Sequence, residues 1–387
     1  MHITRRQTKS IQIGSVKIGG GAPVSVQSMT IPHPRDVKAT VEQIHQLEQA
    51  GCELVRVAVP DDEAANALSS IKSQISIPLI ADIHFDHRLA LAAAKVVDCV
   101  RINPGNIGPW WKMAEVLQAV TDNGIPLRVG VNGGSLERPL LEKYGYPTAE
   151  ALAESALNAV HAIEDAGFTN MKVSLKASDV HMAVDAYWLF SHQSDYPLHI
   201  GITEAGTAAT GAVKSSVGLG WLLSQGIGDT LRVSLAADPV EEVKVGFEIL
   251  KSLELRHRGV NVIACPTCGR VEIDVVRMAN ELEQRLGHIT KPLNVSVLGC
   301  VVNGIGEGKE ADIGIAGGQG MGILFKKGKL VKKVPSEELV DLLVEEVERM
   351  ALETDEETSA SLASLPDFEE ALSPLGSSRK LPVLPKG

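Results

Sequence analysis

The sequence predicts a (β/α)8 barrel of the TIM type followed by a smaller α/β domain. Short β-branched runs alternate eight times with amphipathic helical stretches, which is the order that produces a closed parallel barrel. Glycines at 51, 124, 167 and 226 stand where helices end before the next strand. Hydrophobic residues make up 44% of the 387 residues but aromatic residues only 4%, so aliphatic α/β cores are expected.

The predicted elements of the barrel follow one another from the N-terminus. A strand pair at 10–13 and 16–18 is expected to close the bottom of the barrel. The eight strands are predicted at 24–29, 54–59, 78–83, 99–103, 127–132, 171–176, 198–203 and 231–235, with helices including 37–50, 90–97, 111–121, 149–166 and 239–253. An open doubly wound sheet is the alternative, but no G-x-G-x-x-G follows an early strand.

The last third is predicted to form a separate unit. Strands are expected at 260–264, 293–298, 312–316, 322–325 and 329–331, with helices at 271–286 and 336–352. Ser336 is the expected N-cap of the last helix. The predicted domains are therefore 1–255 for the barrel and 256–353 for the second unit, and residues 354–387 are expected to be a disordered tail, because they are rich in Ser, Pro and acidic residues.

Charge and hydropathy limit the partners of this chain. A formal net charge of −11 argues against a nucleic acid, whose phosphates require a basic surface. No apolar run approaches the length of a membrane span, and the N-terminus lacks a signal-peptide core. We therefore expect a cytoplasmic protein without a membrane or nucleic-acid partner.

Basic residues alternate with apolar residues inside the predicted strands. Because successive side chains of a strand point to opposite faces, the apolar face packs on the outer helices and the basic face points into the barrel lumen. The basic residues concerned are Arg56, Arg101, Arg128, Lys172 and Arg232. Asp82 and Glu204 can neutralise part of this charge, and a local structural network of ion pairs is the alternative to a ligand. Five cations at matching positions favour a polyanion site, since arginine binds phosphate well.

Polar residues mark the carboxyl ends of the predicted strands, where TIM-barrel active sites lie. They are Asn103, Asn106, Asn132, Ser174, Lys176, Thr203, Glu204 and Ser234. Glu204 is the best-placed acid. His84 is either a general acid or an ordinary loop histidine, and the sequence leaves both readings open.

Three cysteines follow predicted strands of the last third. Cys265 and Cys268 form a C-x2-C pair, and Cys300 is followed seven positions later by Glu307. This pattern is typical of an iron–sulfur cluster with a fourth ligand still to be found, and structural zinc is the alternative. Cys52 and Cys99 are interpreted as small core residues. The odd total of five cysteines disfavours a disulfide framework.

Several stretches together resemble the hydroxymethylbutenyl diphosphate synthase family. They are Gln27-Ser28-Met29-Thr30, Val100-Arg101-Ile102-Asn103-Pro104-Gly105-Asn106, Gly201-Ile202-Thr203-Glu204-Ala205-Gly206, Ala264-Cys265-Pro266-Thr267-Cys268-Gly269-Arg270 and Cys300-Val301-Val302-Asn303-Gly304-Ile305-Gly306-Glu307. The resemblance runs from near the N-terminus to about residue 353, and it matches the shorter bacterial form, because no extra domain fits between the barrel and the cysteine module.

The resemblance implies a [4Fe–4S] cluster held by Cys265, Cys268, Cys300 and Glu307. It implies a methylerythritol cyclodiphosphate substrate, two electrons supplied by flavodoxin or ferredoxin, and a head-to-tail homodimer. The substrate is expected to contact Arg56, Arg101, Asn103, Arg128, Asn132, Lys172, Ser174, Arg232 and Ser234. Glu307 and Glu204 are the expected catalytic residues: the first as an iron ligand that substrate oxygen can displace, the second as an aid to proton delivery.

Two other readings remain open from the residues alone. One is a non-redox barrel enzyme that acts on a phosphorylated substrate, similar to the pterin-binding synthases, with zinc in the small domain. The other is an iron–sulfur sensor without catalysis, although a sensor has no need of a cation-lined lumen.

Overall fold

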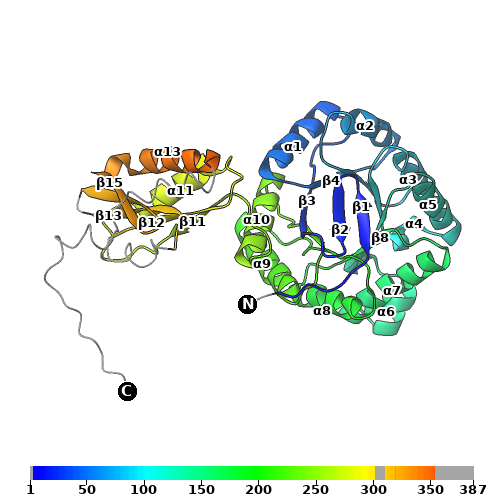
Figure 1. Cartoon of the computed structure of the whole chain (residues 1–387). Coiled ribbons are helices and arrows are strands. Elements are labelled where there is room, and N and C mark those ends of the chain that lie inside the picture. The colour runs from blue at the N-terminus through cyan, green and yellow to red at the C-terminus, as the bar shows by residue number, and fades with distance from the viewer. Residues whose placement is uncertain (1–2, 301–309, 319, 354–387) are drawn as a thin grey trace, which may run out of the picture. The chain divides into compact units, whose positions relative to one another are not determined.

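The computed structural model describes residues 3–300, 310–318 and 320–353, and the chain divides into two compact units, Met1–His257 and Arg258–Gly387. Figure 1 shows the first unit as a ring of helices around a barrel of parallel strands, as predicted. The strands are β3 (Ser25–Met29), β4 (Leu54–Ala58), β5 (Leu79–Ile83), β6 (Cys99–Ile102), β7 (Leu127–Asn132), β8 (Met171–Lys176), β9 (His199–Ile200) and β10 (Thr230–Leu231).

The barrel closes through parallel pairing alone. The strand order is β8-β7-β6-β5-β4-β3-β10-β9, and a parallel bridge between Val173 and Leu198 joins the two ends. Strands β9 and β10 are shorter than predicted. A Cβ atom on Gly201 would lie 2.7 Å from the Arg232 carbonyl oxygen, so the segments that follow β9 and β10 pass very close to each other. Beyond this point both segments continue as loops. Those loops carry Glu204 and Ser234.

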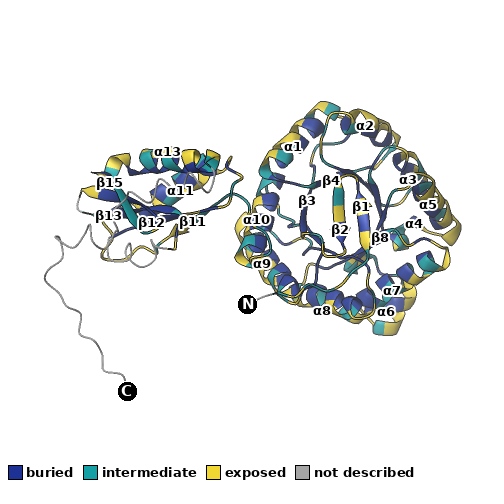
Figure 2. Cartoon of the chain, in the orientation of Figure 1, coloured by how far each residue is buried: buried dark blue, intermediate teal, exposed yellow. Residues whose placement is uncertain are grey.

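Helices cover the outside of the barrel. The main ones are α1 (Val37–Ala50), α2 (Asp62–Lys72), α3 (His87–Ala93), α5 (Trp110–Asp122), α7 (Ala149–Asp165), α8 (Val180–Ser191), α9 (Ala208–Ser224) and α10 (Pro239–Ser252), with short α4 (Pro104–Ile107), η1 (Gly133–Ser135) and α6 (Arg138–Tyr144). Aspartate N-caps begin several of them, for example Asp36 and Asp179. In Figure 2 the strands and the inner faces of the helices are buried and the outer faces exposed.

The N-terminal hairpin closes the bottom of the barrel, as predicted. Strands β1 (Ser10–Ile13) and β2 (Val16–Gly19) pair antiparallel and lie inside the ring in Figure 1. Ile11, Ile13 and Ile18 form one buried cluster with Leu54, Ile80 and Cys99. The latter three stand at or near the amino ends of β4, β5 and β6, so the carboxyl ends of the barrel strands are left open for a site.

The second unit is a five-stranded sheet with helices on one face. Its strands, in spatial order, are β11 (Val260–Ala264), β12 (Leu293–Leu298), β13 (Ile313–Gly317), β14 (Met321–Lys326) and β15 (Lys329–Pro335). The first three are parallel and the last two antiparallel to their neighbours. Helices α11 (Val275–Leu286) and α13 (Leu339–Leu352) share one core with the sheet.

Two predicted boundaries in this unit are wrong. Helix α11 begins at Val275 because Asp274 caps it, accepting from the Arg277 amide, while the amide of Glu272 donates to the Gly299 carbonyl. Ser336 is not the N-cap of α13, because Ser336–Glu338 forms a 3-10 turn (η3) and the helix starts at Leu339. The predicted tail lies outside the described residues, and no described helix has the length and apolarity needed to cross a bilayer.

Candidate functional site

The barrel lumen contains the basic residues that the strand alternation predicted. Arg56, Arg101, Arg128 and Lys172 are 0–7% exposed, and the Arg232 side chain is 16% exposed. Three of them lie side by side, since Arg101 pairs with Arg128 and Arg128 with Lys172 across neighbouring parallel strands. Arg56 lies lower in the barrel, because it pairs with Ile80, which pairs with Cys99, two positions before Arg101. The sequence placed these residues correctly because side chains two positions apart share a strand face.

Asp82 neutralises part of this charge at one side of the lumen. Its Oδ1 accepts from Arg101 Nη1 at 2.8 Å, and its Oδ2 lies 3.6 Å from Arg56 Nε. Burial alone raises the pKa of Asp82, but attraction to Arg56, a hydrogen bond with His84 and attraction to Arg101 hold the pKa well below its usual value. Asp82 is therefore an anion that fixes two arginines.

His84 lies beside this pair. Arg101 Nη1 is 3.1 Å from His84 Nε2, and Nε2 is 3.5 Å from Asp82 Oδ2. A guanidinium group can only donate, so the contact with Arg101 uses Nε2 as an acceptor, whereas a hydrogen bond to Asp82 needs a proton on Nε2. The His84 ring therefore contacts both members of the Arg101–Asp82 pair through one nitrogen atom.

Glu242 is the second carboxylate that pairs with a lumen arginine, and it was not among the residues predicted from the sequence. Its oxygens accept from Arg232 Nε and Nη2 at 3.1 Å each, and from the Ser28 hydroxyl at 2.9 Å. Glu242 comes from the outer helix α10, where it shares the buried face with Val243 and Gly246. An acidic residue on the apolar face of an amphipathic helix is the signal that could have identified it.

Glu204 does not fill the neutralising role expected of it. Its side chain is exposed in the loop after β9, and the described residues give it no ion pair; Glu242 pairs with Arg232 instead. Its φ of +51° is one of three positive values among the described non-glycine residues. A non-glycine residue in this left-handed region costs about 1–3 kcal/mol, and such residues cluster at functional sites. The loop therefore holds an exposed carboxylate in a strained backbone.

Three further basic side chains, Arg128, Lys172 and Lys176, lack a carboxylate partner in the described part of the lumen. Arg128 donates through Nε and Nη2 to the Ser174 hydroxyl at 3.2 and 3.0 Å, while its Nη1 and the Lys172 Nζ are buried with no hydrogen-bond partner. Burial lowers the pKa of Lys172 to about 7, and burial with repulsion from Arg128 and Arg56 holds the pKa of Lys176 well below its usual value. Lys176, named above only as a strand-end group, belongs to this set.

The balance of charge decides between a structural network and a ligand site. Among the described lumen residues, Arg56, Arg101, Arg128, Lys172, Lys176 and Arg232 face two carboxylates, Asp82 and Glu242. A structural network accounts for the residues around Asp82 and Glu242 but not for the other three cations. Buried cations without counterions are costly, so an anion bound at this face relieves the excess. The arrangement suits a polyphosphate better than a neutral molecule.

The polar residues at the strand ends have mixed roles. Asn103 caps α4: its Oδ1 accepts from the Gly105 amide at 3.1 Å and its Nδ2 donates to the Ser135 hydroxyl at 2.6 Å. Asn132 and Ser234 are half-buried at the mouth, and Ser174 is buried under Arg128. Contacts of these four residues with a substrate stay predictions, and for Asn103 the structure adds a local structural role.

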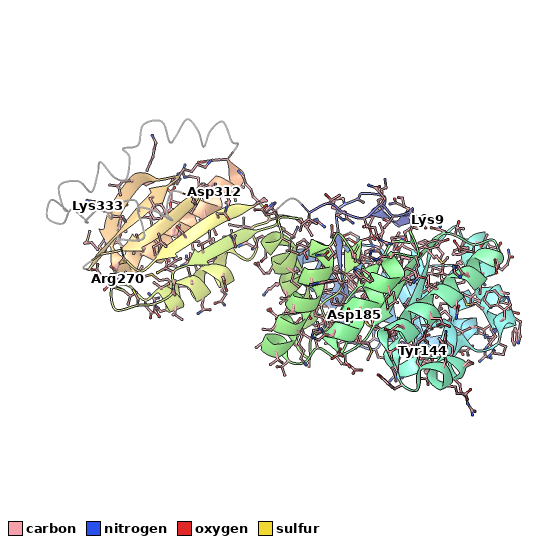
Figure 3. All side chains as sticks on the ribbon, turned by 90° about the horizontal axis from the view of Figure 1, so that it is seen from below. Lys9, Tyr144, Asp185, Arg270, Asp312 and Lys333 are labelled. Atoms are coloured by element: carbon pink, nitrogen blue, oxygen red, sulfur yellow. The ribbon has the colours of Figure 1, made fainter. Side chains whose placement is uncertain are left out.

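The cysteines lie at the carboxyl edge of the second sheet. Cys265 follows β11 and Cys300 follows the adjacent parallel β12, so both leave the sheet at the same edge. Figure 3 shows Arg270, which follows the C-x2-C pair, at the opposite end of this sheet from Asp312, which precedes β13. The three thiols form no disulfide. Glu307 lies outside the described residues, and no described set of three His, Cys, Asp or Glu side chains is gathered as one ion site.

The donors around Cys265 fit an iron–sulfur group. The Gly299 amide donates to Cys265 Sγ at 3.1 Å, which is how backbone amides stabilise a sulfur ligand. A Cβ on Gly299 would lie 2.6 Å from Val271 Cγ2 and 3.4 Å from that sulfur, so a side chain here disturbs the loop. By contrast, burial raises the pKa of Cys52 to about 12 and of Cys99 to about 11, as expected for inert core thiols.

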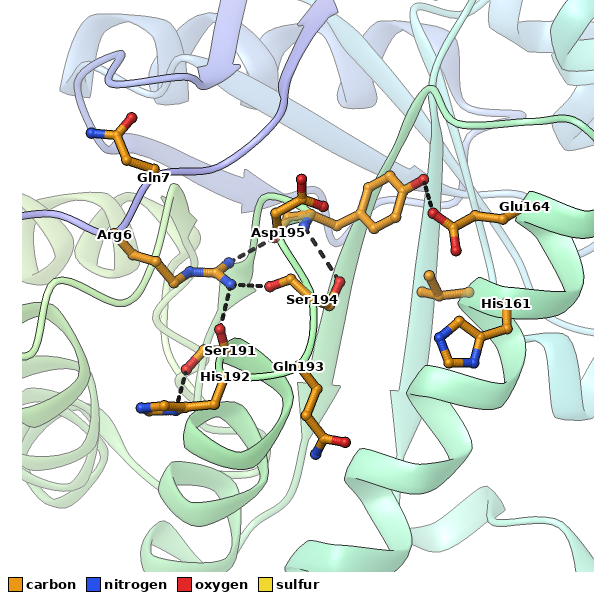
Figure 4. Close-up of a pocket in the computed structure, with 11 residues that line it drawn as sticks. Arg6, Gln7, His161, Glu164, Ser191, His192, Gln193, Ser194 and Asp195 are labelled. Carbon is orange, nitrogen blue, oxygen red and sulfur yellow. Dashed lines mark hydrogen bonds between the residues drawn. The ribbon is translucent and has the colours of Figure 1, made fainter.

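A pocket of about 430 Å³ lies in the barrel unit, and none of the lumen cations lines it. Figure 4 shows it beside Arg6, His161, Glu164 and the segment that follows α8. Arg6 donates to the backbone carbonyls of Ser191 and Tyr196 at 2.9 and 2.7 Å, so its guanidinium group is used to hold the chain terminus. This pocket lies at the amino end of β9, opposite the strand ends that carry Glu204 and Ser234. We do not assign it to the reaction.

We predict that Lys172→Met stabilises the ligand-free barrel at pH 7. Between about pH 7 and pH 10 the unfolded chain binds a proton at Lys172 that the folded barrel does not, so wild-type stability rises with pH across this window. Below about pH 7 both states are protonated and the full cost of burying the charge is present. The advantage of the variant should therefore shrink toward pH 10.

Urea unfolding followed by tryptophan fluorescence tests this, since all four tryptophans lie in the barrel unit. Lys17→Met, at an exposed lysine of the hairpin, is the control and should show no such trend. Parallel stability curves for wild type and Lys172→Met across this pH range would contradict the interpretation of Lys172.

Both units match known protein families. Residues 8–247 match the GcpE TIM-barrel domain and residues 261–349 the GcpE protein C-terminal domain. The chain is 56% identical over 350 residues to "4-hydroxy-3-methylbut-2-en-1-yl diphosphate synthase (flavodoxin)" of Geobacter sulfurreducens, covering 90% of this chain and 99% of that protein. A protein of the same name from Magnetococcus marinus is 57% identical over 348 residues, covering 90% and 94%.

Among solved structures, dihydropteroate synthase from Xanthomonas albilineans aligns with 64% of this chain and 99% of its own, at a TM-score of 0.46 and 13% identity. That similarity is too weak to carry an inference about function. The two domain matches and the curated relatives agree with each other over nearly the whole described chain. The chain therefore belongs to the GcpE family, whose curated members are named 4-hydroxy-3-methylbut-2-en-1-yl diphosphate synthases.

Proposed function

We propose that the chain converts 2-C-methyl-D-erythritol 2,4-cyclodiphosphate to (E)-4-hydroxy-3-methylbut-2-enyl diphosphate, in the methylerythritol phosphate route to isoprenoids. The product is the one in the names of the curated relatives. The observation that carries the proposal is the excess of buried cations over carboxylates in the lumen. Substrate and product are both diphosphates, and they supply the negative charge that this lumen lacks.

The reaction is a two-electron reductive opening of the ring. The cyclic dianion takes up two electrons and one proton. The ring C–O bond breaks, the freed diphosphate gains a negative charge, and the neighbouring hydroxyl leaves as water with that proton. Because the charge on the diphosphate increases, cations that are not already neutralised favour the product side of the reaction.

The lumen residues bind and orient the diphosphate in this proposal. Arg128, Lys172 and Lys176 have no carboxylate partner among the described residues, so they are the strongest candidates for phosphate contacts. Arg56, Arg101 and Arg232 contribute from around Asp82 and Glu242, which fix their orientation. Hydrogen bonds from Asn103, Asn132, Ser174 and Ser234 complete the predicted set.

Cys265, Cys268 and Cys300 would hold a [4Fe–4S] cluster, with Glu307 as the fourth ligand. When bound, this cluster supplies the two electrons one at a time. A carboxylate is a weaker ligand for iron than a thiolate, so Glu307 is the ligand that can exchange. The Gly299 amide, which donates to Cys265, would tune the sulfur ligand.

Glu204 is our proposed aid to proton delivery. Its exposed carboxylate, held by a strained backbone at the carboxyl end of the barrel strands, lies on the face where TIM-barrel reactions occur. The proton that it helps to deliver converts the departing hydroxyl to water.

The proposed reaction also needs an electron donor and a reducing compartment. The electron donor is flavodoxin or ferredoxin, and the first of these appears in the names of the curated relatives. The protein acts as a homodimer in the cytoplasm, where cysteine thiols are kept reduced and so stay available to bind iron.

The first test is an anaerobic absorption spectrum followed by a turnover assay. We expect a broad brown charge-transfer band that bleaches with dithionite and recovers when the cyclodiphosphate is added, with product detected by mass spectrometry. Cys300→Ser should lose iron and turnover, whereas Cys52→Ala, at a core thiol of the barrel, should retain both. A colourless protein with about one zinc per chain would overturn the reductase proposal.

The second test separates substrate binding from the cluster. Arg128→Met, which removes a fully buried cation without a carboxylate partner, should weaken cyclodiphosphate binding by about 100-fold or more and leave the anaerobic spectrum unchanged. Arg138→Met, at a surface arginine that is 90% exposed, is the matched control and should bind normally. Unchanged binding by Arg128→Met would place the diphosphate elsewhere.

A further inference from the structure

Met29 holds an unusual position between two lumen arginines. It is the last residue of β3, which lies between β4 and β10 in the barrel. Its Sδ accepts from Arg56 Nε at 3.2 Å and Nη2 at 3.0 Å, and it lies 3.7 Å from Arg232 Nη1, within hydrogen-bonding distance for sulfur. One thioether therefore joins the two guanidinium groups.

These two arginines also belong to the two carboxylate pairs of the lumen. Arg56 lies beside Asp82 on one side of Met29, and Arg232 is held by both oxygens of Glu242 on the other. The arginines repel each other: burial, together with repulsion from Arg232 and Arg101, outweighs the attraction of Asp82 and lowers the pKa of Arg56 to about 10. Each carboxylate holds its arginine from one side, and Met29 is the group that contacts both guanidinium groups.

A thioether does this without changing the charge. Methionine sulfur is a weak, polarisable and uncharged acceptor, so it can orient two donors while both remain fully cationic. A carboxylate at the same position would bind both arginines more strongly, but it would also cancel one of the charges that an anion needs. An aliphatic side chain would fill the space and provide no acceptor.

We propose that Met29 is a positioning residue that holds Arg56 and Arg232 ready for the diphosphate and preserves their charge. The inference rests on the proposed function, because it assumes that these arginines contact the substrate. It assigns to Met29 a role in substrate affinity that acts only through the two arginines. Met29 itself takes no part in electron or proton transfer.

Three side chains of similar size separate the possible roles of position 29. Met29→Leu keeps the volume and removes the acceptor, Met29→Gln keeps a neutral acceptor, and Met29→Glu adds a negative charge. We expect Met29→Leu to bind the cyclodiphosphate about tenfold more weakly, Met29→Gln to stay within about threefold of wild type, and Met29→Glu to lose about 100-fold or more.

Two readouts are needed. Equilibrium binding of the cyclodiphosphate without reductant measures affinity, and steady-state turnover with dithionite separates KM from kcat. For Met29→Leu we expect KM to rise about tenfold and kcat to stay within about twofold of wild type, because the arginines act on substrate binding. Tryptophan fluorescence and the anaerobic spectrum confirm that each variant keeps the barrel fold and the cluster.

The outcomes distinguish this inference from the proposed function. Wild-type affinity in Met29→Leu, or equal weakening in Met29→Leu and Met29→Gln, would overturn the acceptor role and leave Met29 as packing. Wild-type affinity in Met29→Glu would overturn the argument about charge. Failure of the proposed function would instead appear in the wild-type protein, as no turnover of the cyclodiphosphate.

Discussion

The excess of positive charge inside the barrel is the constraint on which the rest of the structure depends. Strand alternation points Arg56, Arg101, Arg128, Lys172, Lys176 and Arg232 into one enclosed space. The interior has a low effective dielectric constant, so these groups repel each other where they are charged. Burial accordingly lowers the pKa of Lys172 to about 7 and holds the pKa values of Arg128 and Lys176 well below their usual values. The protein keeps them apart with Asp82, Glu242, the Ser174 hydroxyl and the Met29 sulfur, none of which cancels the whole charge. The ligand-free barrel is therefore less stable than an aliphatic one, and an anion recovers that stability.

Much of this arrangement could be predicted from the sequence, because it follows from the period of a strand. The alternation in Val55-Arg56-Val57 and in Lys172-Val173-Ser174 assigns each side chain to a face without any knowledge of its neighbours. The order of elements along the chain predicted where the N-terminal hairpin packs, and the apolar runs before the cysteines predicted the strand ends at which they stand. These features depend on local periodicity and on the order of elements along the chain.

Pairings between elements could not be predicted in this way. Glu242 reaches Arg232 from a helix outside the barrel, and no local sequence pattern in either segment predicts that the two residues pair. The place of Glu204 after the seventh strand predicts that it neutralises part of the lumen charge, but its backbone has a positive φ and its side chain is exposed. Ser336 is not the N-cap because it opens a 3-10 turn and the helix begins three residues later, at Leu339. Glu307 entered as a ligand through the family resemblance, since spacing alone left the fourth position open.

The most direct test of this account is the number of protons that the protein takes up when it binds the cyclodiphosphate. Calorimetry without reductant near pH 8, in buffers with different ionisation enthalpies, measures that number. Lys172, whose pKa is held at about 7 by burial, is neutral there without ligand and should regain its proton beside a bound dianion. We predict an uptake of about one proton per site for the wild-type protein and a smaller uptake for Lys172→Met. Binding without proton uptake would show that burial in the lumen does not lower the pKa of Lys172, and would contradict this account.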